Sequence, residues 1–198
     1  MSNYEMMDYI RCGNSGLKLP RMALGAWYSF SDNDDYENMR ALVNTAFENG
    51  ITYFDLANNY GPQVGAAEIN FGKILKQDFA GRRNELLIAT KAGHKMWEGP
   101  YGDGGSRKYL LSSLDESLKR LDIDYIDIFY HHRYDPETPI LETMLALKSM
   151  VDSGKVLYAG ISKYPLAVVK EALQIAKEIH LPLIVGQYKV SMLVQDVF

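Results

Sequence analysis

The sequence predicts an α/β fold, in which helices cover a parallel sheet. Short apolar segments rich in β-branched and aromatic residues alternate with segments of helical periodicity along the 198 residues. This alternation is typical of parallel strands joined by right-handed crossovers. The apolar segments begin about every 32 residues. Two architectures fit this pattern, a doubly wound open sheet and a (β/α)8 barrel.

The expected elements follow one another in a simple order. We expect six strands, at residues 21–27, 51–55, 86–91, 125–131, 156–161 and 183–187. We expect five helices, at residues 36–48, 66–79, 107–121, 139–153 and 165–179. Gly50 and Gly154 end two of these helices, because glycine tolerates the left-handed conformation of a helix C-terminus. Ser106 is suited to N-cap the third helix, and Gly13 and Gly16 bracket a short segment ahead of the first strand.

The sequence of the loop after the first strand distinguishes between the two architectures. A doubly wound nucleotide-binding sheet usually carries G-x-G-x-x-G there, whereas this chain has Gly25-Ala26-Trp27-Tyr28. Eight units of the observed spacing need about 260 residues, close to the size of a complete barrel. The sequence therefore predicts a single domain, residues 1–198, that is an incomplete (β/α)8 barrel with about six of eight strands and without its last two β/α units.

Composition excludes several classes of protein and partner. The chain has 25 acidic and 21 basic residues, which leaves no basic footprint for nucleic acid or an anionic membrane. It contains neither an apolar run of about 20 residues nor a signal-peptide pattern. A single cysteine, Cys12, predicts a reducing cytoplasmic location and a packing role. His94 and His180 are expected at the surface, and no residue spacing predicts a metal site.

Polar residues close three successive predicted strands. Asp55 ends the second strand with Tyr60 in the loop behind it, Lys91 ends the third, and His131-His132-Arg133 ends the fourth. The carboxyl ends of barrel strands face one pocket. Each residue could have a structural role by itself, but their occurrence at successive strand ends indicates a catalytic site.

The chemistry that this set suggests is proton donation to a carbonyl. A nearby ammonium favours a phenolate and lowers the pKa of a tyrosine, and a carboxylate holds the ammonium charged. Tyr60, Lys91 and Asp55 could form such a relay, with a histidine bonded to the substrate oxygen. Side chains cannot supply a hydride, so a nicotinamide cofactor is implied.

Several motifs resemble those of the aldo-keto reductases, and in particular the branches of bacterial L-glyceraldehyde 3-phosphate reductases and potassium-channel β-subunits. The resemblance spans nearly the whole chain. It rests on residues 50–62, with Gly65, Glu68, Phe71 and Gly72 after them, and on residues 90–93, 99–102, 104–110, 117–121, 127–133 and 159–162. It implies an NADP-dependent oxidoreductase of the TIM-barrel type that uses NADPH.

The resemblance also implies roles for individual residues. Tyr60 would be the general acid, tuned by Asp55 and Lys91, and His132 is chosen over His131 because it directly precedes Arg133. Some channel subunits have asparagine at that position, so a histidine favours a working reductase. The implied substrate residues are Trp27, His132 and Arg133, and the implied cofactor-binding residues are Gly25, Ala26, Asp55, Ser162 and Gln187. Lys163 departs from the asparagine common in the family.

Two functions of different classes remain open. One is the NADPH-dependent reduction of a small aldehyde or ketone, such as glyceraldehyde 3-phosphate or methylglyoxal. The other is a truncated relative with little or no turnover that acts as a binding or assembly module, because unpaired edge strands attract other chains and could support a homo-oligomer. The loop 102–108 could bind a phosphate or could simply be a flexible loop, and Arg133 could assist it or pair with Asp135.

Overall fold

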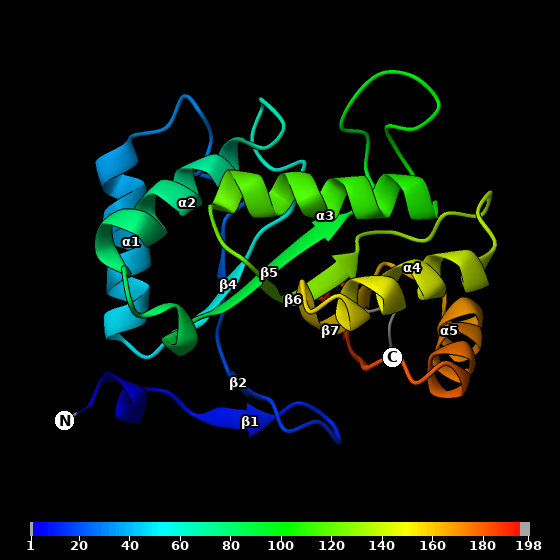
Figure 1. The fold of residues 1–198 in the computed structure, drawn as a ribbon. Helices are drawn as coiled ribbons and strands as arrows, with labels where there is room; N and C mark the ends of the chain where they lie inside the picture. The colour runs from blue at the N-terminus through cyan, green and yellow to red at the C-terminus, as the bar shows by residue number, and fades with distance from the viewer. Residues whose placement is uncertain (1, 195–198) are drawn as a thin grey trace.

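A six-stranded parallel sheet forms the centre of the computed structural model, which describes residues 2–194 (Figure 1). Its strands are β3 (Leu24–Gly25), β4 (Tyr53–Asp55), β5 (Leu87–Ala92), β6 (Ile126–His131), β7 (Val156–Ser162) and β8 (Leu183–Gln187). They lie side by side in chain order, and every neighbouring pair is parallel. A doubly wound sheet reverses its strand order at a switch point. The sequential order therefore identifies an incomplete barrel.

Five α-helices pack on one face of this sheet within the described residues. They are α1 (Tyr36–Glu48), α2 (Ala66–Asp78), α3 (Arg107–Leu121), α4 (Ile140–Asp152) and α5 (Leu166–Glu178). A large apolar core fills the space between helices and strands. A smaller cluster, built around Tyr53, Ile128 and Tyr130, lies on the other face of the sheet, which is the inside of a barrel. The predicted helices are therefore confirmed, and no boundary differs from the prediction by more than one residue.

An antiparallel hairpin precedes the sheet and is absent from our sequence-based prediction. Its strands are β1 (Tyr9–Arg11) and β2 (Lys18–Pro20), and a short 3-10 helix, η1 (Asn3–Met6), comes before them. Leu17 and Leu19 pack against the inner apolar cluster, so the hairpin lies on the side of the sheet away from α2 and α3 (Figure 1). Strands of only three residues carry too little periodicity to be recognised in the sequence.

The first predicted strand, residues 21–27, is wrong in extent. Only Leu24–Gly25 pairs with β4. The Arg21 amide instead donates to the Asp8 carbonyl at 3.0 Å, which ties this end to the hairpin. The Ala26 amide donates to the Asp55 carbonyl at 2.9 Å, and the chain then leaves the sheet before Trp27.

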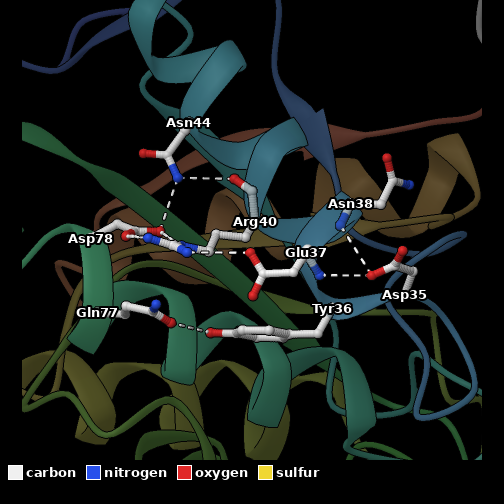
Figure 2. A network of polar contacts seen from close by, with 8 residues as sticks. All are labelled: Asp35, Tyr36, Glu37, Asn38, Arg40, Asn44, Gln77 and Asp78. Carbon is white, nitrogen blue, oxygen red and sulfur yellow. Dashed lines mark hydrogen bonds and ion pairs between the residues drawn. The ribbon is translucent and has the colours of Figure 1, made fainter.

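Helices α1 and α2 are joined by a network of polar side chains (Figure 2). Arg40 on α1 donates Nε and Nη2 to the two carboxylate oxygens of Asp78 on α2, each at 2.7 Å. Asn44 donates to the same carboxylate at 2.9 Å. Asp35 N-caps α1 by accepting from backbone amides of its first turn. A two-pronged guanidinium–carboxylate contact fixes the orientation of the two helices as well as their separation.

No helix within residues 2–194 is long and apolar enough to cross a membrane.

Candidate active site

A buried lysine lies at the centre of the candidate site. Strand β5 is buried along its whole length, and the Lys91 side chain has no exposed surface. Its Nζ donates to Asp55 Oδ2 at 2.8 Å, to the Leu56 carbonyl at 2.7 Å and to Tyr60 Oη at 3.3 Å. A buried ammonium is stable only when it is paired and hydrogen-bonded. The three partners come from the end of β4 and the loop after it, so this corner of the sheet positions both the acid and its neighbours.

The pKa of Tyr60 is shifted in the direction opposite to our expectation. Burial, followed by the negative charge of Asp55, raises the pKa of the Tyr60 hydroxyl above its usual range. Burial also lowers the pKa of Lys91, an effect that the Asp55 carboxylate opposes. Burial removes water that would solvate the phenolate, and the Asp55 carboxylate repels its negative charge, so both effects favour the neutral phenol. Tyr60 is therefore a protonated donor at neutral pH.

His132, and not His131, faces the tyrosine. The His132 amide donates to the Ala92 carbonyl at 2.9 Å, and the imidazole lies edge-to-face with the Tyr60 ring at a centroid separation of 5.8 Å. The neighbouring His131 side chain points elsewhere, with its Nδ1 at 2.5 Å from Tyr164 Oη, as alternation along an extended chain requires. Burial, aided by the charge of Lys91, lowers the pKa of His132 to about 2, so its imidazole is neutral.

Aromatic residues from the loop after β3 border the site. The Trp27 ring stacks on the Tyr60 ring at 5.8 Å, with 21° between the planes. The Tyr28 ring also stacks on the Trp27 ring, at 4.6 Å. Trp27 was expected here, whereas Tyr28 was not singled out, although an aromatic pair directly after the first strand was a signal in the sequence. Both residues are exposed, so their rings offer a surface for a ligand.

Residues expected to bind the cofactor gather around Asp55. Gln187, at the end of β8, donates Nε2 to Asp55 Oδ2 at 3.0 Å. Ser162 is the register partner of Gln187 and is buried. At Gly25, no atom lies within 4 Å of the place that a Cβ would occupy, so the backbone is open to close approach. Lys163 has the left-handed backbone (φ 55°) that asparagine adopts more readily than most residues.

Arg133 is bound to the loop after β5 and does not pair with Asp135. Its Nη2 donates to Asp103 Oδ1 at 2.8 Å and its Nε to the Gly93 carbonyl at 2.7 Å. Asp135 instead accepts from the Gly105 amide at 2.7 Å. The loop between β5 and α3 is thus hydrogen-bonded at Gly93, Asp103 and Gly105 to residues of the loop after β6.

His94 also differs from our expectation. It is half-buried, and its ring lies edge-to-face with the His132 ring at 4.6 Å. Its position depends on the path of the loop after β5, which sequence periodicity does not encode. His180 is exposed, as expected.

A buried ion pair lies on the helix-covered face of β5, opposite Lys91. We did not predict it from the sequence. The Glu68 side chain on α2 has no exposed surface and accepts from Arg120 Nε on α3 at 2.7 Å. Its other oxygen accepts from Thr90 Oγ1 at 2.5 Å. Thr90 precedes Lys91 on β5 and points to the opposite face, so the pair supports the strand that carries the lysine. A glutamate among the mostly apolar residues of this helix face was the available sequence signal.

Comparisons with known proteins identify relatives that match most of this chain. The chain is 52% identical over 190 residues to L-glyceraldehyde 3-phosphate reductase of Escherichia coli, a match that covers 96% of this chain and 55% of the relative. It is 35% identical over 177 residues to a probable voltage-gated potassium channel subunit beta of Oryza sativa subsp. japonica, covering 88% of this chain and 52% of that protein. The chain thus spans about half the length of these relatives.

The comparison with solved structures and the match to a family model identify the family. The crystal structure of a thermostable aldo-keto reductase in complex with the inhibitor epalrestat matches with a TM-score of 0.78 and 32% sequence identity, covering 93% of this chain and 63% of that chain. The model of the aldo/keto reductase family matches residues 21–197. With this match over most of its length and a relative at 52% identity, the chain belongs to the aldo/keto reductase family.

Proposed function

We propose that this protein reduces small aldehydes or ketones to alcohols with NADPH, and that Tyr60 is the general acid. The observation that carries the proposal is the contact of Lys91 Nζ with both Asp55 Oδ2, at 2.8 Å, and Tyr60 Oη, at 3.3 Å. A phenol and a carboxylate that both contact one ammonium, with a neutral imidazole next to the phenol, form a proton-donating group.

Tyr60 is suited to give up a proton to a substrate. Its oxygen accepts from Lys91, which leaves its own hydrogen available for the carbonyl oxygen, where it becomes the hydroxyl hydrogen of the alcohol. The Lys91 ammonium stabilises the negative charge that remains on Tyr60. His132 is neutral and so offers one N–H donor, which can bond to the carbonyl oxygen and polarise it.

The residues at the strand ends fit a nicotinamide. Asp55 Oδ1 is buried without a hydrogen-bond partner among residues 2–194. The Gln187 amide donates to the other oxygen of the same carboxylate, and Ser162 is the register partner of Gln187 on the adjacent strand β7. These groups match the donors and acceptors of a carboxamide, and Gly25 leaves its backbone open to close approach. A bound nicotinamide would supply the hydride that side chains cannot.

The substrate class is a small carbonyl compound of the kind represented by glyceraldehyde 3-phosphate or methylglyoxal. The relative from Escherichia coli is named for glyceraldehyde 3-phosphate, at 52% identity. Trp27 provides an exposed apolar wall next to Tyr60, and Arg133 lies at the next strand end with its guanidinium partly exposed. Both features suit a short polar aldehyde.

Oxidation of NADPH in the presence of methylglyoxal or glyceraldehyde 3-phosphate tests this function. Tyr60→Phe should lower turnover by about 10²–10⁴-fold while binding of NADPH is retained. Tyr36→Phe is the matched control, because its hydroxyl bonds to Gln77 on the helical layer, outside the site (Figure 2). Unchanged turnover in Tyr60→Phe would contradict the assignment of the acid. NADPH binding without turnover by the wild-type chain would favour the binding-module alternative.

A further inference from the structure

We propose that His94 is a positioning residue, which holds the His132 imidazole in the orientation that faces Tyr60. This inference rests on the proposed function and names a residue for the same site. The supporting observation is a group of ring contacts at the carboxyl edge of the sheet. The His132 ring makes edge-to-face contacts with both the Tyr60 ring, at 5.8 Å and 74°, and the His94 ring, at 4.6 Å and 81°.

His132 lacks the hydrogen bond that usually orients a functional imidazole. Histidines in active sites are commonly fixed by a bond from the second ring nitrogen to a carboxylate or a carbonyl. The Nδ1 atom of His132 is buried and has no hydrogen-bond partner within the described residues. Packing by the two adjacent rings must therefore take the place of that bond.

The backbone leaves the ring little other freedom. The His132 amide is bonded to the Ala92 carbonyl at 2.9 Å. Gly93 approaches so closely that a Cβ added there would lie 3.2 Å from the His132 Cβ. These contacts fix the position of the His132 Cβ, so the side chain retains only rotation about its Cα–Cβ and Cβ–Cγ bonds. The edge-to-face contact with His94 restricts that rotation, since aromatic pairs prefer such geometry.

The backbone around His94 is itself held by hydrogen bonds, so His94 can restrain its neighbour. Its carbonyl accepts from Tyr109 Oη at 2.5 Å, and the Tyr109 side chain is fully buried in the core. The preceding Gly93 carbonyl accepts from Arg133 Nε at 2.7 Å. The segment is thus bonded on one side to α3 and on the other to the residue that follows His132.

The contact between the two histidines is a packing contact between neutral rings. Burial lowers the pKa of His94, and the positive charges of Lys163 and Arg133 lower it further, while Asp103 opposes them. An aromatic ring without a titrating nitrogen should therefore replace His94 in this role, whereas a small side chain should not.

Histidine-labelled NMR of the ligand-free chain tests the contact without any need for turnover. The chain has four histidines, so each imidazole can be assigned by its disappearance in one variant. In His94→Ala the ring resonances of His132 should shift and broaden, because the ring current and the packing of its neighbour are lost. In His94→Phe they should stay sharp. His180→Asn is the control, since His180 is exposed and asparagine accepts its positive φ of 54°.

Kinetics supply the second measurement. His94→Ala should lower kcat by about two- to tenfold, as expected for the loss of one aromatic pair, with the KM for NADPH unchanged and with recovery in His94→Phe. Sharp, unshifted His132 resonances in His94→Ala would overturn the proposal, as would an unchanged kcat in an active chain. If the wild-type chain shows no turnover, that result counts against the proposed function, and the NMR spectra still decide the role of His94.

Discussion

Removal of the Glu68 carboxylate tests whether the ion pair behind the site supports the fold. The change is Glu68→Ala, on the face of α2 that packs against α3. In the native chain Glu68 accepts from Arg120 Nε at 2.7 Å and from Thr90 Oγ1 at 2.5 Å. The variant leaves a guanidinium and a hydroxyl without their acceptor in a nearly dry environment, where the Arg120 side chain is only 17% exposed.

The expected cost follows from that burial. Breaking one partner of a buried ion pair costs about 3–5 kcal/mol. Arg120 retains a hydrogen bond from Nη2 to Ser117 Oγ at 3.3 Å, so we expect the lower half of that range. A domain of ordinary stability unfolds with about 5–15 kcal/mol, so the loss is a large fraction of the total. The Arg120 side chain also packs against Gly65, where an added Cβ would lie 2.8 Å from the Arg120 Cδ, so the loop that carries Tyr60 should loosen as well.

Urea unfolding at constant pH measures the change in the free energy of unfolding, with the slope m as a check on the transition. The matched control is Glu116→Ala, because the pair of Glu116 with Lys119 is 49% and 70% exposed and should contribute less than about 1 kcal/mol. The double variant Glu68→Ala, Arg120→Ala should cost less than the sum of the two single variants, since it leaves no unpaired charge. A Glu68→Ala cost no larger than that of Glu116→Ala, or strict additivity in the double variant, would refute the reasoning.

Two further predictions concern the stability of the fold and rest on buried side chains. Burial lowers the pKa of His131 to about 4 and of His132 to about 2, so at pH 5 the unfolded chain binds protons there that the folded chain does not. The free energy of unfolding should therefore fall as the pH drops below about 6.5, by up to about 1.4 kcal/mol per pH unit for each histidine. His131→Gln should flatten this pH dependence. An unaltered pH dependence in that variant would contradict the conclusion that the His131 pKa is lowered in the folded chain. Gly160→Ala should cost about 1–3 kcal/mol in urea unfolding, because the new Cβ would lie 2.5 Å from the buried ring of Tyr130. Gly16→Ala, with no atom within 4 Å, is its control, and equal stabilities of the two variants would show that the ring can move aside.

Much of the fold could be read from local pattern. The order of strands and helices is encoded in short-range periodicity, and strands in a barrel lie side by side in chain order. For the same reason, residues at strand ends could be expected to meet, and Asp55, Lys91 and His132 do lie at one edge of the sheet. The hairpin escaped this reasoning, since strands of three residues have no clear period.

Contacts made by loops, and the effects of burial, could not be predicted in this way. The partner of Arg133 is Asp103, 30 residues earlier in the chain, and not the nearby Asp135, because the path of a loop depends on contacts with distant segments. His94 lies against His132 for the same reason. The upward pKa shift of Tyr60 likewise arises from desolvation in the assembled site.

The sequence by itself thus determined which elements form, their order, and which chemical groups stand at the strand ends, because those properties depend on periodicity within a few residues. Only the packed chain decided the charge state of those groups and the orientation of the His132 ring. Both depend on how much water is excluded and on which side chains from other segments lie alongside.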